Sequence, residues 1–189
     1  MADELLGVLQ TLRGTFSLGL LCWAVVKDPE TQVLIHSHDV CILKQGLRAV
    51  KQGQNRKIPA GTEVYDVAVS GPGVPNDYDH LSQELSKMLL RNFSADCFEA
   101  VKEYCEKSGQ MKEMQSQPWY QFARIVRNCL THTQCWKFTR RDLPLLPITW
   151  NGKTIDASLQ GKESDGTVYN WFDACVLYAA MHSFAQSLR

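Results

Sequence analysis

The sequence predicts a mainly α-helical protein, a helical bundle with one small β-hairpin near residues 147–156. Two observations predict this fold class. Apolar residues recur at spacings of three and four over several long stretches, as they do on the buried face of a helix. The segment ITWNGKTI places Asn-Gly between two short β-like arms, which is a strong hairpin signal. A chain of 189 residues without repeats or a clear linker suits a single domain over residues 1–189.

Charge and cysteine usage narrow the class of protein. Twenty basic and twenty acidic residues cancel, so any binding to a polyanion must use a local basic patch. Seven cysteines, several of them inside apolar runs, favour reduced thiols over a disulfide framework. The first residues, MADELLG, are acidic where a signal peptide needs basic ones, and the apolar run Leu18–Val26 is too short to span a bilayer. We therefore expect a cytoplasmic protein without membrane association.

In the N-terminal third of the chain, the sequence pattern predicts three helices. Residues 3–12 form a short helix, and a second begins after Gly14 and continues through LGLLCWAVV. The second is apolar on nearly every side, so it is expected deep in the core, and it ends before Pro29. Ser37 or Asp39 caps a third helix through DVCILKQGLRAVK. The polar residues after this helix predict a loop. Residues 58–76 are compatible with either a strand or an irregular connection.

The middle of the chain predicts the longest helices. Asp77–Lys107 is helical with a break at Asn92–Ala95, and Gly109 permits a turn. The next helix has Pro118 in its first turn. Its apolar stripe consists of Trp119, Phe122, Ala123, Val126, Cys129 and Leu130.

The C-terminal part contains the hairpin and a last helix. Two prolines in DLPLLP exclude a helix before the hairpin. SDGT at 164–167 starts the last helix. Its apolar face is expected to include Trp171, Phe172, Cys175, Val176, Tyr178, Ala179 and Phe184.

The helix that follows Pro118 carries a polar set of chemical interest: Arg127, Asn128 and His132, in the letters VRNCLTH. Asn128 and His132 are four residues apart and share a face, and the long side chain of Arg127 reaches the same patch. These residue types suit RNA cleavage without a metal or other cofactor. Histidine moves the protons of the ribose 2′-hydroxyl and the leaving oxygen, arginine binds the phosphate, and asparagine orients them.

One helix supplies only one histidine, whereas the reaction needs an acid and a base. Two copies of the helix meeting across a twofold axis supply both, which predicts a symmetric homodimer. The residues just past the motif fit RNA binding as well. Lys137, Arg140 and Arg141 offer cations for phosphates, and Trp136 beside them offers a ring for base stacking. A buried aromatic pair, Trp136 and Phe138, with a solvated basic rim explains the same residues.

Arg127, Asn128 and His132 on the late, long helix of a helical protein resemble the R-x4-H motif of the HEPN superfamily. The segment from about Gln117 to Ile155 is also similar to the same region in some plasmid- and phage-associated HEPN-like proteins. The resemblance implies a bundle that dimerises through the motif helices. It further implies a metal-independent endoribonuclease of the toxin or defence type, with an antitoxin or regulatory protein as partner. Other HEPN-like proteins are non-catalytic binding or assembly modules, and that alternative stays open.

Simpler and competing interpretations also stay open. Arginine and histidine near the end of a helix complement its dipole, so the motif is also explained as a solvated face. Cys129, His132 and Cys135 are spaced like part of a zinc site, but structural zinc needs four ligands and no second knuckle is present. LIHSHD offers an H-x-H pair with no downstream ligands, and a helix cap at Ser37 or Asp39 explains the same residues more simply. Glu99 and Glu103 share a helix face that can approach the motif, although carboxylates four apart are common.

Overall fold

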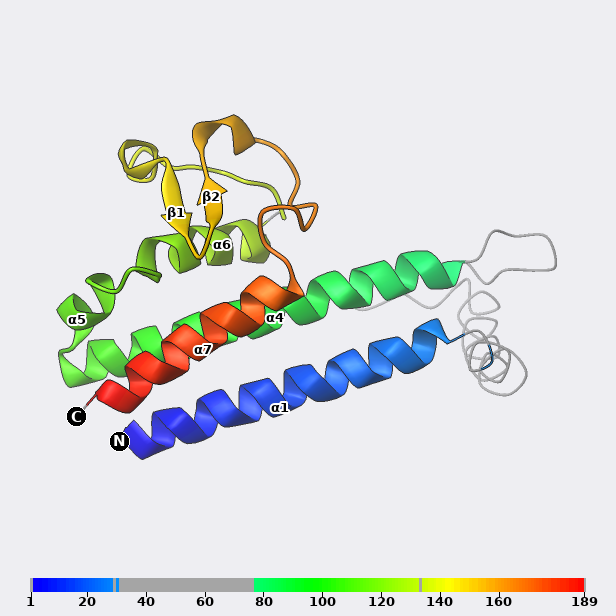
Figure 1. Cartoon of the computed structure of the whole chain (residues 1–189), viewed down its shortest axis with the longest axis horizontal. Coiled ribbons are helices and arrows are strands. Elements are labelled where there is room, and N and C mark those ends of the chain that lie inside the picture. The colour runs from blue at the N-terminus through cyan, green and yellow to red at the C-terminus, as the bar shows by residue number, and fades with distance from the viewer. Residues whose placement is uncertain (1, 29, 31–76, 133, 189) are drawn as a thin grey trace, which may run out of the picture. The chain divides into compact units, whose positions relative to one another are not determined.

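The computed structural model of the chain describes residues 2–28, 30, 77–132 and 134–188, without the side chains of 26, 77–81 and 132. Within these ranges the protein is mainly helical with one antiparallel hairpin (Figure 1), so the predicted fold class is confirmed. The elements are α1 (Ala2–Lys27), α4 (Asp77–Ser108), α5 (Met111–Gln115), α6 (Tyr120–His132), β1 (Ile148–Trp150), β2 (Lys153–Ile155) and α7 (Trp171–Ser187).

The chain divides into two compact units. The larger contains Met1–Gly19 and Lys87–Arg189, and the smaller contains Leu20–Ser86. In the described part of the smaller unit, the indole Nε1 of Trp23 donates a hydrogen bond of 2.9 Å to the carbonyl oxygen of Ser82. The expectation of one domain over residues 1–189 stays a prediction.

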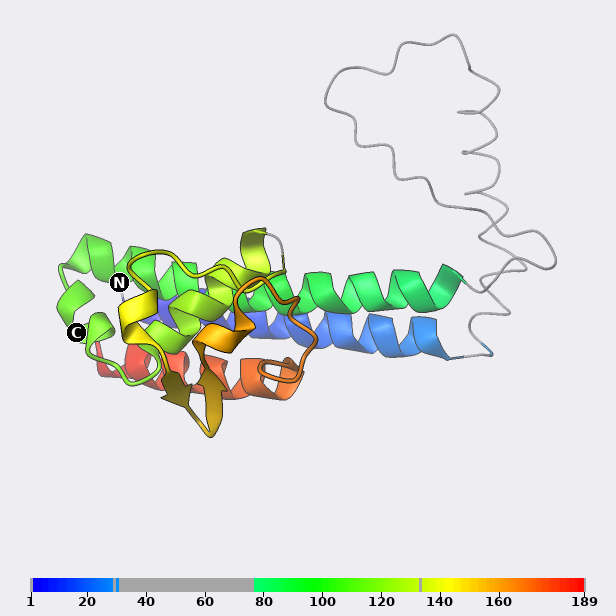
Figure 2. The same cartoon turned by 90° about the horizontal axis from the view of Figure 1, so that it is seen from above.

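Aromatic side chains form the core of the larger unit. Phe16 of α1 stacks on Phe93 of α4 with ring centroids 4.1 Å apart, and Phe93 lies 5.6 Å from the ring of Tyr178 on α7. On the α6 side, Phe122 lies 5.5 Å from Trp150 of β1, and the hairpin packs on α6 (Figures 1 and 2). Stacked and tilted ring pairs stabilise a protein beyond the effect of the apolar area that they bury. These rings therefore help to fix how the helices pack.

The prediction of two helices in the first 27 residues is wrong. α1 is continuous through Gly14, because a single glycine inside a helix costs only about 1 kcal/mol and does not end it. Gly19 is required in the same helix by packing: a Cβ there would collide with the side chain of Leu89 on α4. The helix ends at Lys27, two positions before Pro29, as the sequence predicts.

The expectation that the LGLLCWAVV segment lies deep in the core is also wrong. Leu18, Leu21 and Val25 are 62%, 64% and 54% exposed. One helix in the described part of the chain, at Ala2–Val25, is long and apolar enough to cross a membrane, by length and composition alone. A core helix of a soluble protein or a signal sequence satisfies the same two criteria.

The break expected at Asn92–Ala95 does not exist, and α4 runs unbroken from Asp77 to Ser108. The polar residues that suggested a break have other partners. Ser94 is buried, and its hydroxyl lies 2.9 Å from the hydroxyl of Tyr169, so a hydrogen bond satisfies it within the core. Gly109 makes the predicted turn with φ of 73°.

The hairpin agrees closely with the sequence prediction. Ile148 pairs with Ile155 and Trp150 with Lys153. Asn151 and Gly152 have φ of 47° and 73°, which is the two-residue turn expected from Asn-Gly.

The last helix begins later than SDGT. Asp165 instead accepts hydrogen bonds from Thr167 in a loop, and α7 is capped by Asn170. The Asn170 side chain accepts hydrogen bonds from the backbone N–H groups of Phe172 and Asp173. The Asp173 carboxylate in turn accepts one from the Asn170 backbone N–H, which completes a capping box. Of the predicted face, Tyr178 and Phe184 are buried as expected, but Phe172 is 73% exposed, and Cys175 and Ala179 are exposed too. The buried residues are Asp173, Ala174, Leu177, Tyr178, Met181, Phe184 and Ala185.

The expected third helix after Ser37 or Asp39, the loop that follows it and the segment 58–76 lie outside the described residues. The structure therefore leaves these expectations as predictions.

Candidate functional site

Helix α6 carries the polar set predicted from the sequence. Its buried face includes Trp119, just before the helix, and Phe122, Ala123, Val126, Cys129 and Leu130, and Tyr120 and Ile125 are buried as well. The predicted stripe is therefore buried. Arg127 and Asn128 lie beside it at the edge of the buried face, and both are half-buried. His132 is the last residue of α6, and its side chain lies outside the described part of the chain.

Both ends of the Arg127 guanidinium group are held by neighbouring acceptors. Its Nη1 donates a hydrogen bond of 3.0 Å to Oδ1 of Asn128. Its Nη2 forms an ion pair of 2.5 Å with Oε1 of Glu99, which comes from α4. The two partners are 31% and 40% exposed, so water reaches the pair. The Nε nitrogen is buried and has no hydrogen-bond acceptor among the described residues.

Of the two carboxylates that the sequence places on one face of α4, only Glu99 reaches the motif. Its second oxygen lies 3.7 Å from Nζ of Lys102, and Lys102 lies 3.4 Å from Glu106. Glu103 instead pairs with Lys107 at 2.6 Å. The charges of Glu106, Lys102, Glu99 and Arg127 therefore alternate in sign along a chain of ion pairs that ends at Arg127. The sequence places Glu99 on a face that can approach the motif, but only the packing of α4 against α6 selects Arg127 as its partner.

The cations predicted to bind RNA are exposed, but the predicted aromatic platform is not. Lys137, Arg140 and Arg141 are open to solvent, and none of the three pairs with a carboxylate in the described part of the chain. Trp136 is only 2% exposed. A base-stacking residue needs an open ring face, so the RNA-binding role expected for Trp136 is wrong in this structure. Its backbone, which bonds to Lys162 and Gly161, anchors the segment instead.

A buried carboxylate that sequence reasoning missed fixes the segment after α6. Asp142 is 1% exposed, and its Oδ1 pairs with Nη2 of Arg124 on α6 at 2.6 Å. Its Oδ2 accepts hydrogen bonds from the backbone and hydroxyl of Thr139, at 2.8 and 2.7 Å. Burial alone would raise the pKa of Asp142, but the Thr139 bonds and the Arg124 charge outweigh it and lower that pKa. The spacing of Thr139 and Asp142 is a recognisable turn pattern, whereas the pairing with Arg124 depends on the fold.

The environment of Cys129 is unfavourable for metal binding beside the motif. Cys129 is buried, and burial raises the pKa of its thiol to about 12. A metal ligand must be a thiolate, which this environment disfavours. Within the described residues no group of three His, Cys, Asp or Glu side chains is placed to hold a metal ion. The H-x-H pair of LIHSHD lies outside these residues.

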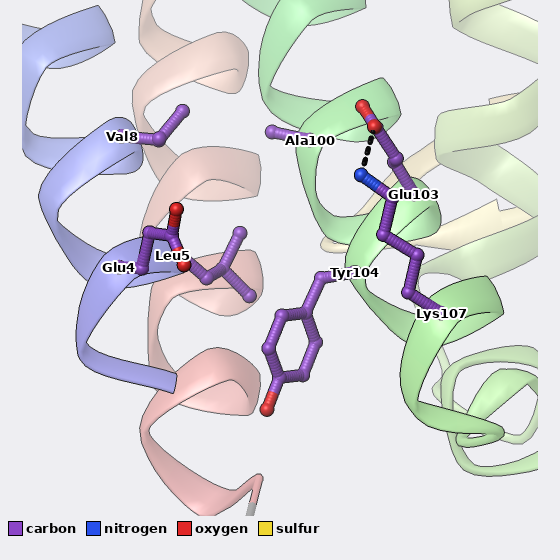
Figure 3. Close-up of a pocket in the computed structure, with 7 residues that line it drawn as sticks. All are labelled: Glu4, Leu5, Val8, Ala100, Glu103, Tyr104 and Lys107. Carbon is purple, nitrogen blue, oxygen red and sulfur yellow. Dashed lines mark hydrogen bonds and ion pairs between the residues drawn. The ribbon is translucent and has the colours of Figure 1, made fainter. Parts of the chain in front are cut away.

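A surface pocket of about 260 Å³ lies elsewhere in the larger unit, between the first turns of α1 and the end of α4. Figure 3 shows Leu5 and Val8 facing Tyr104 and Ala100 across it, with the Glu103–Lys107 ion pair at its rim. The motif residues contribute nothing to its lining.

No protein-family model, curated protein or solved structure matches this chain. The HEPN resemblance therefore depends on the residues of α6 and of the segment after it.

Proposed function

We propose that this protein is a HEPN-like, metal-independent endoribonuclease whose site is shared by two copies of helix α6 in a homodimer. The observation that supports the proposal is the arrangement around Arg127. A half-buried guanidinium is bonded to the neighbouring Asn128 and oriented by Glu99, and His132 follows one helical turn after Asn128.

Each residue has a role that its chemistry suits. His132 acts as the acid or base, because histidine is the side chain best suited to exchanging protons near neutral pH. One histidine takes the proton from the ribose 2′-hydroxyl, whose oxygen attacks the adjacent phosphorus. The histidine of the other protomer protonates the leaving 5′-oxygen. The products are a 2′,3′-cyclic phosphate and a 5′-hydroxyl.

Arg127 binds the scissile phosphate. A guanidinium has five N–H groups; among the described residues Glu99 and Asn128 engage one on each Nη, and the Nε–H is buried, which leaves the second N–H of each Nη. Donors therefore remain for the phosphate oxygens, whose negative charge they stabilise as the bond to the leaving oxygen breaks. Asn128 holds the guanidinium from the motif helix itself.

The exposed cations past α6 supply the local field that the neutral chain lacks as a whole. Lys137, Arg140 and Arg141 sit on the segment that the Arg124–Asp142 pair fastens to α6. Cations placed there contact phosphates on either side of the cut, and their contribution falls as salt rises.

The test is RNA cleavage by the purified protein in EDTA. We expect the wild-type protein to cut bulk or transfer RNA to cyclic-phosphate ends, to leave DNA intact, and to need no added metal. His132→Ala should abolish cleavage without unfolding the protein. His182→Ala, on α7, is the matched control and should cut normally. Equal cleavage by the His132→Ala protein and its parent contradicts the assignment.

A second function, a non-catalytic binding or assembly module with the same fold, is favoured by one observation. The carboxylate of Glu99 already neutralises Arg127. A protein of this kind would bind its partner unchanged after His132→Ala, and it would leave RNA intact under every condition in which it is folded.

A further inference from the structure

We infer that Glu99 is the positioning residue for Arg127: its carboxylate, on a different helix, holds the guanidinium in the orientation that receives the scissile phosphate. This inference rests on the proposed function, because it assigns a role within the same site. The inference also goes beyond the proposed function, because the R-N-x3-H pattern contains no acidic residue and lies entirely on α6.

Two contacts fix the Arg127 guanidinium. Nη2 is held by Glu99 at 2.5 Å and Nη1 by Asn128 at 3.0 Å. Because the group is planar, contacts at two different nitrogens determine the direction of the whole plane. Asn128 is on the same helix, next to Arg127, so the contact from α4 is the one that ties the guanidinium to a second element.

Fixing the side chain before RNA arrives has a catalytic consequence. A guanidinium that is already oriented can stabilise the charge that develops in the transition state without first having to rearrange. The engaged N–H groups leave others for the phosphate, so Glu99 need not be displaced when RNA binds. Orientation therefore improves the chemical step more than it changes binding.

Glu99 repels a bound phosphate less than an isolated carboxylate would. Its second oxygen faces Nζ of Lys102 at 3.7 Å, so two cations share the one anion. The Glu99–Arg127 pair is also open to water, and pairs this exposed contribute little to stability. Removing Glu99 should therefore leave the protein folded.

The test compares three variants of the full chain by steady-state cleavage of RNA in EDTA. For Glu99→Ala we expect kcat to fall roughly tenfold to a hundredfold, with a much smaller change in KM. Glu99→Gln should recover most of that loss, because its amide oxygen still accepts from Nη2. Glu103→Gln is the matched control: it lies one turn further along α4, pairs with Lys107, and should leave kcat unchanged.

The outcomes separate this inference from the proposed function. Wild-type protein that cuts RNA together with a Glu99→Ala protein of equal kcat overturns the inference alone. A Glu99→Ala protein that cuts faster also overturns it, because Glu99 would then obstruct the phosphate. Wild-type protein that leaves RNA intact overturns both. If Glu99→Ala does not fold, Glu99→Asp carries the same expectation, since its carboxylate is one methylene too short to reach Arg127.

Discussion

At the scale of single residues, Asp142 shows how a buried charge is made tolerable. An unpaired carboxylate inside a protein is strongly unfavourable. Asp142 has an ion pair with Arg124 and two hydrogen bonds from Thr139, so its charge is compensated on both oxygens. Because Arg124 belongs to α6, this cluster connects the motif helix to the segment that carries the exposed cations.

Replacing this carboxylate should lower stability in a pH-dependent way. Asp142→Asn should reduce the free energy of unfolding at pH 7 by about 1.5–3 kcal/mol, the usual range for a hydrogen bond to a charged group. Its folded-state pKa is lowered, so the contribution is complete above the unfolded value of about 3.9 and is lost as the pH falls through the folded-state value. Urea titrations between pH 7 and pH 2 measure this.

The gap between the wild type and the Asn variant should thus be constant near neutral pH and shrink in acid below about pH 4. Asp165→Asn, in an exposed loop, is the control and should change stability far less. A gap that is absent at pH 7, or one that persists undiminished in strong acid, would show that the charge of Asp142 is not what stabilises this segment.

At the scale of elements, prediction succeeded where a local rule determines the structure. Asn151-Gly152 gave the hairpin, because both residues must adopt positive φ and these two types do so most readily. The stripe of α6 was also correct, because its apolar residues occupy one side only.

Prediction failed where local rules leave a choice to packing. α7 is apolar on most sides, so the sequence does not show which side is buried, and Phe172 was placed wrongly. The breaks expected at Gly14 and near Ser94 did not form, because the rest of each helix and the bond to Tyr169 offset the weak local preference.

Replacing each of two glycines by alanine should change the stability of the protein in opposite directions. Gly152 has φ of 73°, where a Cβ is strained, so Gly152→Ala should destabilise the protein by about 1–2 kcal/mol. Gly14 lies inside α1, and a Cβ there meets nothing within 4 Å, so Gly14→Ala should stabilise it by about 0.5–1 kcal/mol. Chemical denaturation of both variants gives the two values. Changes of the same sign would contradict the assigned backbone conformations.

At the scale of the whole molecule, the candidate site is a product of tertiary structure. The sequence locates Arg127, Asn128 and His132 because they lie on one helix at regular spacing. It cannot assign Glu99 to Arg127 or Asp142 to Arg124, because each pair joins segments far apart in the chain. Likewise, the sequence leaves Trp136 as either a stacking ring or a buried one, and only the fold shows that it is buried.

The proposed dimer adds one more level, since a site made by two protomers needs a histidine from each. Co-expressing wild-type protein with His132→Ala protein produces mixed dimers, and the fraction of each chain is measured by mass spectrometry. A dimer with one missing histidine has an acid without a base, or a base without an acid. It should therefore be inactive, and cleavage should depend on the square of the wild-type fraction.

The most direct test of the shared site is accordingly the rate of RNA cleavage, in EDTA, by such mixtures. At equal proportions of the two chains, we expect about a quarter of the wild-type rate, because only one dimer in four carries both histidines. A rate of about one half would mean that each protomer cuts alone. That result would contradict a site built from two copies of α6.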